Sequence, residues 1–211
     1  MLSYKRKPLG KSTEHGFSLM EIMIVLSIIA VLSTVSMPVM RGFAASRRLK
    51  SSAQSIADTF SYARDMAITE RTTHLVVFDV DNNRYWLASS ETFDVQNPIA
   101  SAGRVAATTS TPQGQPVVSR TSGVMGIAKP LNEGITIAAL STTNNGVIQN
   151  LTTGVDYVYF TPTATSVNTV VYLRNVRDHF IAVNVEASTG RNSIQQLSSE
   201  EIQTLGLAND L

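Results

Sequence analysis

The residues best suited to chemistry lie near the N-terminus, where one carboxylate stands inside an apolar run. Glu21 is the only charged residue among residues 17–40. An ionised side chain in a membrane helix costs about 2.5–3.5 kcal/mol near the bilayer centre, and less near a helix end. Cleavage between Gly16 and Phe17 would create an α-amine four residues before Glu21, able to neutralise the carboxylate on its own chain or on a neighbouring helix. Alternatively, Glu21 lies at head-group level, where the helix macrodipole favours an anion.

No other residues have the types and spacing of a catalytic or metal site. The chain has no cysteine, which excludes disulfides, thiolate metal sites and cysteine nucleophiles. There is no HExxH, P-loop or GxSxG motif. The three histidines are far apart in sequence: His15, His74 and His179. Asp79, Asp81 and Asp94 offer carboxylate oxygens, but their spacing matches no calcium-binding loop. We therefore expect no enzymatic activity, no cofactor and no metal ion.

The elements that would position Glu21 are a basic leader and a long apolar helix. The leader, residues 1–16, holds one acidic residue, Glu14, against four basic ones: Lys5, Arg6, Lys7 and Lys11. Residues 17–40 are long enough to cross a membrane, which takes about 20 mainly apolar residues. A cleaved secretory signal would need a small-residue site after this run, and neither Ala30 nor residues 42–45 supplies a convincing one. A plain signal anchor would leave the carboxylate unexplained.

A second, amphipathic helix is predicted over residues 41–72. Pro38 and Gly42 should bend or loosen the helix between the two segments without necessarily ending it. The apolar stripe recurs at spacings of 4, 3, 4, 3 and 4 through Leu49, Ala53, Ile56, Phe60, Ala63 and Ala67. We expect this stripe to pack in a core. The alternative, a coiled-coil seam, has few large aliphatic residues to sustain it.

The remaining residues, 73–211, have the pattern of a β-rich domain. A hairpin is predicted over residues 74–88, followed by strands over 135–140, 155–161, 169–174 and 180–186. Ser198 and Glu201 form the pattern of a capping box for a short helix over residues 199–205, with Gly206 after it. Strands that follow one long helix indicate an α+β fold with the helix packed against antiparallel β-sheets.

Residues 89–126 are rich in Ser, Thr, Ala, Gln, Gly and Pro. We expect either a mobile excursion of the chain or a variable loop that carries a short strand near Val117. Loops longer than about 12–15 residues are uncommon in compact domains. We interpret the segment either as a surface for partner contact or as a tolerated insertion.

The segment Gly16-Phe17-Ser18-Leu19-Met20-Glu21, between a basic leader and an apolar helix, resembles the class III signal of type IV pilins and type II secretion pseudopilins. The resemblance implies cleavage after Gly16 and N-methylation of Phe17 by prepilin peptidase, an inner-membrane aspartic protease. It also implies that Glu21 registers the subunit during filament assembly. Pro38 falls where pilin helices often carry a kink-forming proline.

Orientation in the membrane follows from the resemblance rather than from charge. Basic residues flank the apolar run on both sides, so the positive-inside rule does not choose an orientation. The resemblance implies a single-pass inner-membrane protein, with its leader in the cytoplasm and its globular domain in the periplasm or otherwise outside the cytoplasm.

The mature chain further resembles the minor pseudopilin H or FimT-like group, in the stretches 63–68, 76–86, 158–162 and 183–191. This implies a pilin-like fold and a minor subunit of a type II secretion filament, assembled with other pseudopilins or pilins at the filament tip. The alternatives are a FimT-like minor type IV pilin in pilus priming or DNA uptake, and a generic membrane-anchored β-domain.

Some FimT-like proteins bind DNA through a C-terminal Gly-Arg-x-Arg stretch. Here Gly190-Arg191-Asn192-Ser193 keeps only the first arginine, so Arg191 is the one candidate DNA contact. Residues 17–211 carry 13 basic and 15 acidic residues. Because nucleic-acid binding depends on a basic field, nucleic acid is not an expected partner.

Overall fold

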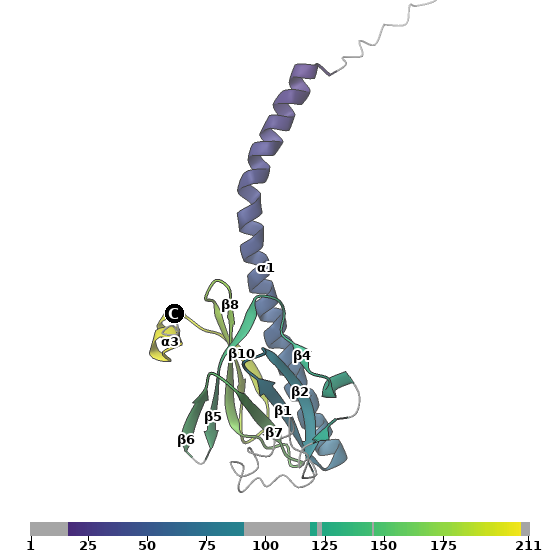
Figure 1. Cartoon of the computed structure of the whole chain (residues 1–211), viewed down its shortest axis with the longest axis vertical. Helices are drawn as coiled ribbons and strands as arrows, with labels where there is room; N and C mark the ends of the chain where they lie inside the picture. Colours follow the sequence, from purple (N-terminus) through teal and green to yellow (C-terminus); the bar gives the residue numbers. More distant parts are fainter. Residues whose placement is uncertain (1–16, 91–118, 122–123, 145, 208–211) are drawn as a thin grey trace, which may run out of the picture. The chain divides into compact units, whose positions relative to one another are not determined.

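The computed structural model describes residues 17–90, 119–121, 124–144 and 146–207, with the side chains of residues 35–42, 119–120, 124 and 144 left out of that description. The chain divides into two compact units, Met1–Arg41 and Gly42–Leu211. One helix, α1 (Leu19–Glu70), contributes to both units (Figure 1). The leader and most of the variable loop, residues 91–118, lie outside the described residues.

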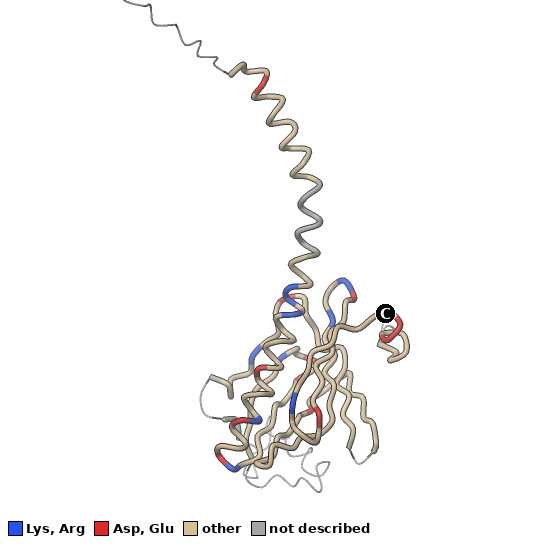
Figure 2. The backbone as a smooth tube through the Cα atoms, turned by 180° about the vertical axis from the view of Figure 1, so that it is seen from behind, with Lys and Arg blue, Asp and Glu red and all other residues tan. Residues whose placement is uncertain are grey.

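In the first unit, α1 begins directly after Ser18, whose carbonyl oxygen accepts hydrogen bonds from the N–H groups of Glu21 (3.0 Å) and Ile22 (3.2 Å). All side chains of residues 17–34 are exposed, and the only charged one is acidic (Figure 2). Three hydroxyl groups of this stretch donate to carbonyl oxygens one turn earlier, those of Ser27, Ser33 and Thr34. The helix therefore satisfies these polar groups internally, as an apolar environment requires.

Within the described part of the chain, no helix combines the length and the apolar character needed to cross a membrane. Membrane crossing by residues 17–40 stays a prediction. The helical assignment continues through Pro38 and Gly42, as expected of residues that bend a helix rather than end it. The kink itself also stays a prediction. The side chain of Pro38 is not described, and Pro38 and Gly42 lie at the boundary between the two units.

In the second unit, the predicted apolar stripe of α1 is buried. All six residues are at most 2% exposed: Leu49, Ala53, Ile56, Phe60, Ala63 and Ala67. Phe60 contacts Phe78 and Phe160 of the neighbouring sheet, with ring centroids 5.8 Å apart in each pair. Core packing of the stripe is therefore confirmed.

Two antiparallel sheets pack with α1. The first sheet has the order β3-β2-β1-β7, with β4 also paired to β2. Its strands are β1 (Thr73–Asp79), β2 (Arg84–Ser90), β3 (Ser119–Arg120), β4 (Lys129–Pro130) and β7 (Val155–Phe160). The second sheet has the order β10-β9-β8-β5-β6. Its strands are β5 (Ile135–Asn144), β6 (Val147–Leu151), β8 (Asn168–Asn175), β9 (Phe180–Val185) and β10 (Asn192–Gln196). The predicted α+β fold, the hairpin and the four later strands are confirmed; β6 and β10 were not predicted.

One apolar core joins α1 to both sheets. In the second sheet, this core contains every second residue of the paired strands, such as Val171 opposite Val183 and Leu173 opposite Ile181. The other face of that sheet carries a smaller cluster around Tyr172, which Leu197 and Leu207 partly cover. These two leucines flank α3 (Ser199–Thr204), which begins with the predicted capping box of Ser198 and Glu201.

Candidate functional site

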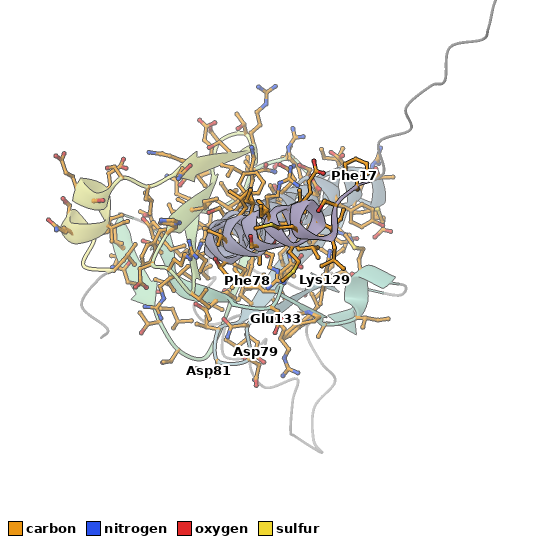
Figure 3. All side chains as sticks on the ribbon, turned by 90° about the horizontal axis from the view of Figure 1, so that it is seen from above. Phe17, Phe78, Asp79, Asp81, Lys129 and Glu133 are labelled. Carbon is orange, nitrogen blue, oxygen red and sulfur yellow. The ribbon has the colours of Figure 1, made fainter. Side chains whose placement is uncertain are left out.

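The predicted scissile bond lies directly ahead of α1. Phe17 and Ser18 are not helical, and the Phe17 side chain is 79% exposed (Figure 3). Gly16 lies outside the described residues. Inside a helix, backbone N–H and C=O groups are bonded to each other, whereas the groups that precede the first turn are free. The backbone at Phe17 is therefore free of helical hydrogen bonds and open to a peptidase.

Glu21 lies in the first turn of α1 and is exposed. The N-terminal end of a helix carries a partial positive charge, so a carboxylate there is favourable and an ammonium group is not. Cleavage after Gly16 would place an ammonium group at this end, two residues before the helix begins. Glu21 can offset that repulsion within its own chain, and its exposure leaves it equally open to the amine of a neighbouring chain.

Arg191, the candidate DNA contact, is exposed but has an acidic neighbour. It follows the turn between β9 and β10, where the Glu186 carboxylate accepts hydrogen bonds from Ser188 (3.0 Å) and Thr189 (2.9 Å). These hydrogen bonds lower the pKa of Glu186, and the charge of Arg191 adds to the effect. The arginine thus stands beside a carboxylate that stays ionised, which offsets its attraction for phosphate.

Gly190 has a structural role that the sequence pattern did not show. Its φ is +59°, and a Cβ atom there would lie 2.6 Å from the carbonyl oxygen of Ala164. The Nε of Arg64 in α1 donates to the carbonyl oxygen of Thr189 at 2.9 Å. Three of the stretches that resemble the H-type group therefore meet at this turn: residues 63–68, 158–162 and 183–191. Their contacts hold the second sheet on α1.

Two of the three aspartates considered for calcium accept hydrogen bonds from other residues of the fold, Asp79 and Asp81. Burial would raise the pKa of Asp79, but hydrogen bonds from Asn82 and Arg84 outweigh that effect and lower it. Asp81 accepts a hydrogen bond from the N–H of Gly154 at 3.0 Å (Figure 3). Asp94 lies outside the described residues. Over the described ranges, no group of three or more His, Asp or Glu side chains could hold a metal ion.

The two histidines that follow residue 16 lie apart in the fold. His74 is fully buried at the start of β1, with Nδ1 3.1 Å from the Thr72 carbonyl oxygen and Nε2 3.1 Å from a Glu70 carboxylate oxygen. His179 is exposed in the turn between β8 and β9. The structure does not bring them together.

Comparison with known protein families identifies the segment around the predicted cleavage site. Residues 11–37 match the prokaryotic N-terminal methylation motif. The N-terminal segment is pilin-like. The match covers the Gly16–Phe17 junction and Glu21, so the predicted resemblance to type IV pilins and pseudopilins is confirmed for this segment.

Two solved structures of the minor pseudopilin EpsH from the type 2 secretion system of Vibrio cholerae are similar to this chain. One shares 14% identity with a TM-score of 0.42, and covers 72% of this chain and 97% of EpsH. The other shares 13% identity with a TM-score of 0.43, and covers 72% and 94%. No curated protein matches the sequence.

Proposed function

We propose that the protein is a minor pseudopilin of a type II secretion system. In this proposal, prepilin peptidase cleaves the chain between Gly16 and Phe17 and methylates Phe17. The mature chain then joins other pseudopilins in a short filament based in the inner membrane. The observation that carries the proposal is the N-terminal methylation motif over residues 11–37, whose predicted junction lies directly ahead of a helix with Glu21 in its first turn.

The exposed apolar surface of the first unit supports anchoring before assembly. Leucine, isoleucine, valine and methionine side chains of residues 19–32 are 46–78% exposed. A helix that is apolar on every side needs lipid or other helices around it. We therefore place residues 17–40 in the inner membrane as a single span, and in the filament core after assembly, with the globular unit in the periplasm. The protein acts as a structural subunit and not as an enzyme.

Mass spectrometry after co-expression with an active prepilin peptidase tests the proposal. The mature protein should lack residues 1–16 and carry one added methyl group on the amine of Phe17. A Gly16→Val variant is the control, because a branched side chain at the scissile bond should leave the leader attached. A wild-type chain that keeps its leader and amine unmodified in cells with active peptidase would refute the proposal.

A further inference from the structure

A basic surface of the Gly42–Leu211 unit lies where the chain arrives from the apolar run. We call it the collar, and it consists of Phe43, Arg47, Arg48 and Lys50 of α1 with Val176 and Arg177 of the turn between β8 and β9. Figure 2 shows Lys and Arg on both elements. The proposed processing and assembly at residues 16–21 make no use of these side chains.

Contacts between segments distant in sequence make the collar one continuous surface. The Nδ2 of Asn132 donates to the carbonyl oxygen of Arg48 at 3.3 Å. A guanidinium nitrogen of Arg48 lies 3.8 Å from a carboxylate oxygen of Glu133. At the next residue, a Cβ atom on Gly134 would lie 3.2 Å from Cγ1 of Val176. Residues 132–134 thus connect the helix to the β8–β9 turn.

The collar combines exposed apolar side chains with basic ones. Phe43 is 63% exposed and Val176 is 75% exposed. The Arg47 guanidinium lies 4.8 Å from the centroid of the Phe43 ring, a cation–π distance. Phe43, Arg47 and Lys50 follow the i, i+4, i+7 spacing of one helix face. Helices that lie at a membrane–water boundary combine lysine and arginine with tryptophan, phenylalanine or leucine, and the collar has the same two classes of side chain.

The charge of the collar is positive after its acidic neighbours are included. Arg47, Arg48, Lys50, Arg174 and Arg177 are opposed by Glu133 and Asp178. The two ion pairs are long, with Arg48 3.8 Å from Glu133 and Arg174 4.0 Å from Asp178. Their side chains are 31–91% exposed, and the basic residues outnumber the two acidic ones. A shallow hollow of about 420 Å³ lies within the collar, lined by Arg47, Arg48, Ser51, Asn132 and Glu133.

We propose that the collar binds an anionic phospholipid surface, with the arginines on lipid phosphates and with Phe43 and Val176 at head-group level. This inference rests on the proposed anchoring, because the apolar run ends at Met40, three residues before Phe43. Chain continuity therefore holds the collar near the bilayer, where clustered basic residues bind anionic lipid. Guanidinium groups suit phosphate because they form two parallel hydrogen bonds with it. Exposed apolar side chains favour a lipid surface over an acidic protein partner.

The absence of cysteine allows a direct test with a single label. The full-length Val176→Cys protein, carrying a fluorophore, is reconstituted in phosphatidylcholine vesicles with and without phosphatidylglycerol, each containing head-group-quenching lipid. We expect quenching that depends on phosphatidylglycerol and is lost at high salt. The Arg47→Gln/Arg48→Gln/Lys50→Gln variant should reduce the ratio of docked to free label by about tenfold or more. A label at Ile148→Cys is the matched control, because Ile148 is 65% exposed in an uncharged hairpin; it should stay unquenched.

Flotation of the same chains on pure phosphatidylcholine tests the anchor separately. If the protein floats but the Val176→Cys label shows no dependence on phosphatidylglycerol, the collar proposal is wrong and the anchor stands. A second outcome is that the protein does not float, while quenching of the wild-type label depends on phosphatidylglycerol and quenching in the triple variant does not. The collar then binds anionic lipid without an anchor. A triple variant that impairs filament assembly while wild-type label stays unquenched would assign the surface to a protein partner and overturn the proposal.

Discussion

The two halves of α1 differ both in apolar content and in surroundings. Every described side chain of residues 17–34 is exposed, whereas the stripe from Leu49 to Ala67 is almost completely buried. The difference lies in the pattern, because the first half is apolar on all faces and the second alternates apolar and polar residues with the helical period. Folding of the globular unit should therefore depend on the second half, while the first half has the proposed roles in processing, anchoring and assembly.

The largest expected effect on stability is a difference between substitutions of two phenylalanines in α1. Phe60→Ala should destabilise the protein by about 3–5 kcal/mol, because it removes a buried ring between Phe78 and Phe160. Phe43→Ala, at a position 63% exposed, should change stability by less than about 0.5 kcal/mol. Chemical denaturation of the full chain in detergent, followed by circular dichroism, measures both. Similar losses for the two variants would contradict the burial pattern of this part of the helix.

The turn that holds the second sheet on α1 should show the next largest effect. Gly190→Ala forces a side chain into a φ of +59° and against the Ala164 carbonyl oxygen, so we expect a loss of about 2–3 kcal/mol. Gly154→Ala is the matched control, with a φ of +89° but no atom within 4 Å of the added Cβ. It should cost only about 1 kcal/mol. Equal costs in the same denaturation assay would show that backbone strain, and not the close approach, fixes glycine at residue 190.

Arg84→Gln should have a smaller, pH-dependent effect on the same unit. Arg84 donates to the buried Asp79 at 2.7 Å, but its own side chain is 43% exposed, so the loss at neutral pH should be about 1 kcal/mol. Asp79 has a folded-state pKa below its ordinary value of 3.8. The stabilisation is thus present above pH 3.8 and is lost as pH falls through the folded-state pKa.

Unfolding free energies measured at pH 7 and at an acid pH well below 3.8 test this dependence. The difference between wild type and Arg84→Gln should shrink at the lower pH, because protonation of Asp79 removes the negative charge that Arg84 contacts. Arg177→Gln removes an exposed arginine as a control and should match wild type at both values. A loss that persists unchanged in acid would show that Arg84 contributes through packing and not through its charge.

The sequence predicted the elements whose signals are local. The helical stripe, the β1–β2 hairpin and the capping box of α3 each depend on residues within a few positions of one another. Strands β6 and β10 were missed because their sequences, VIQNL and NSIQQ, are short and do not alternate apolar and polar residues. The Asn-Gly pair at residues 145–146 was a usable hairpin signal for β6.

The candidate sites also differ in whether they depend on local sequence or on contacts between distant segments. Gly16, Phe17 and Glu21 form a linear motif, so a sequence is sufficient to find them. The constraint on Gly190 and the collar depend on contacts between distant segments, such as Arg64 with Thr189 and Gly134 with Val176. Periodicity and spacing carry no information about such pairs.

The smallest expected effect on stability is in the first half of α1, at Glu21. Glu21→Gln keeps the size of the side chain and removes its charge at an exposed first-turn position, so the unfolding free energy should change by less than about 0.5 kcal/mol. Cleavage after Gly16 should also be unaffected, whereas filament assembly should fall sharply because the new amine loses its acidic partner. Mass spectrometry and recovery of sheared filaments measure the two steps. Glu21→Asp, which restores the charge one methylene shorter, should recover part of the assembly; normal assembly of Glu21→Gln would mean that the carboxylate serves only the helix dipole.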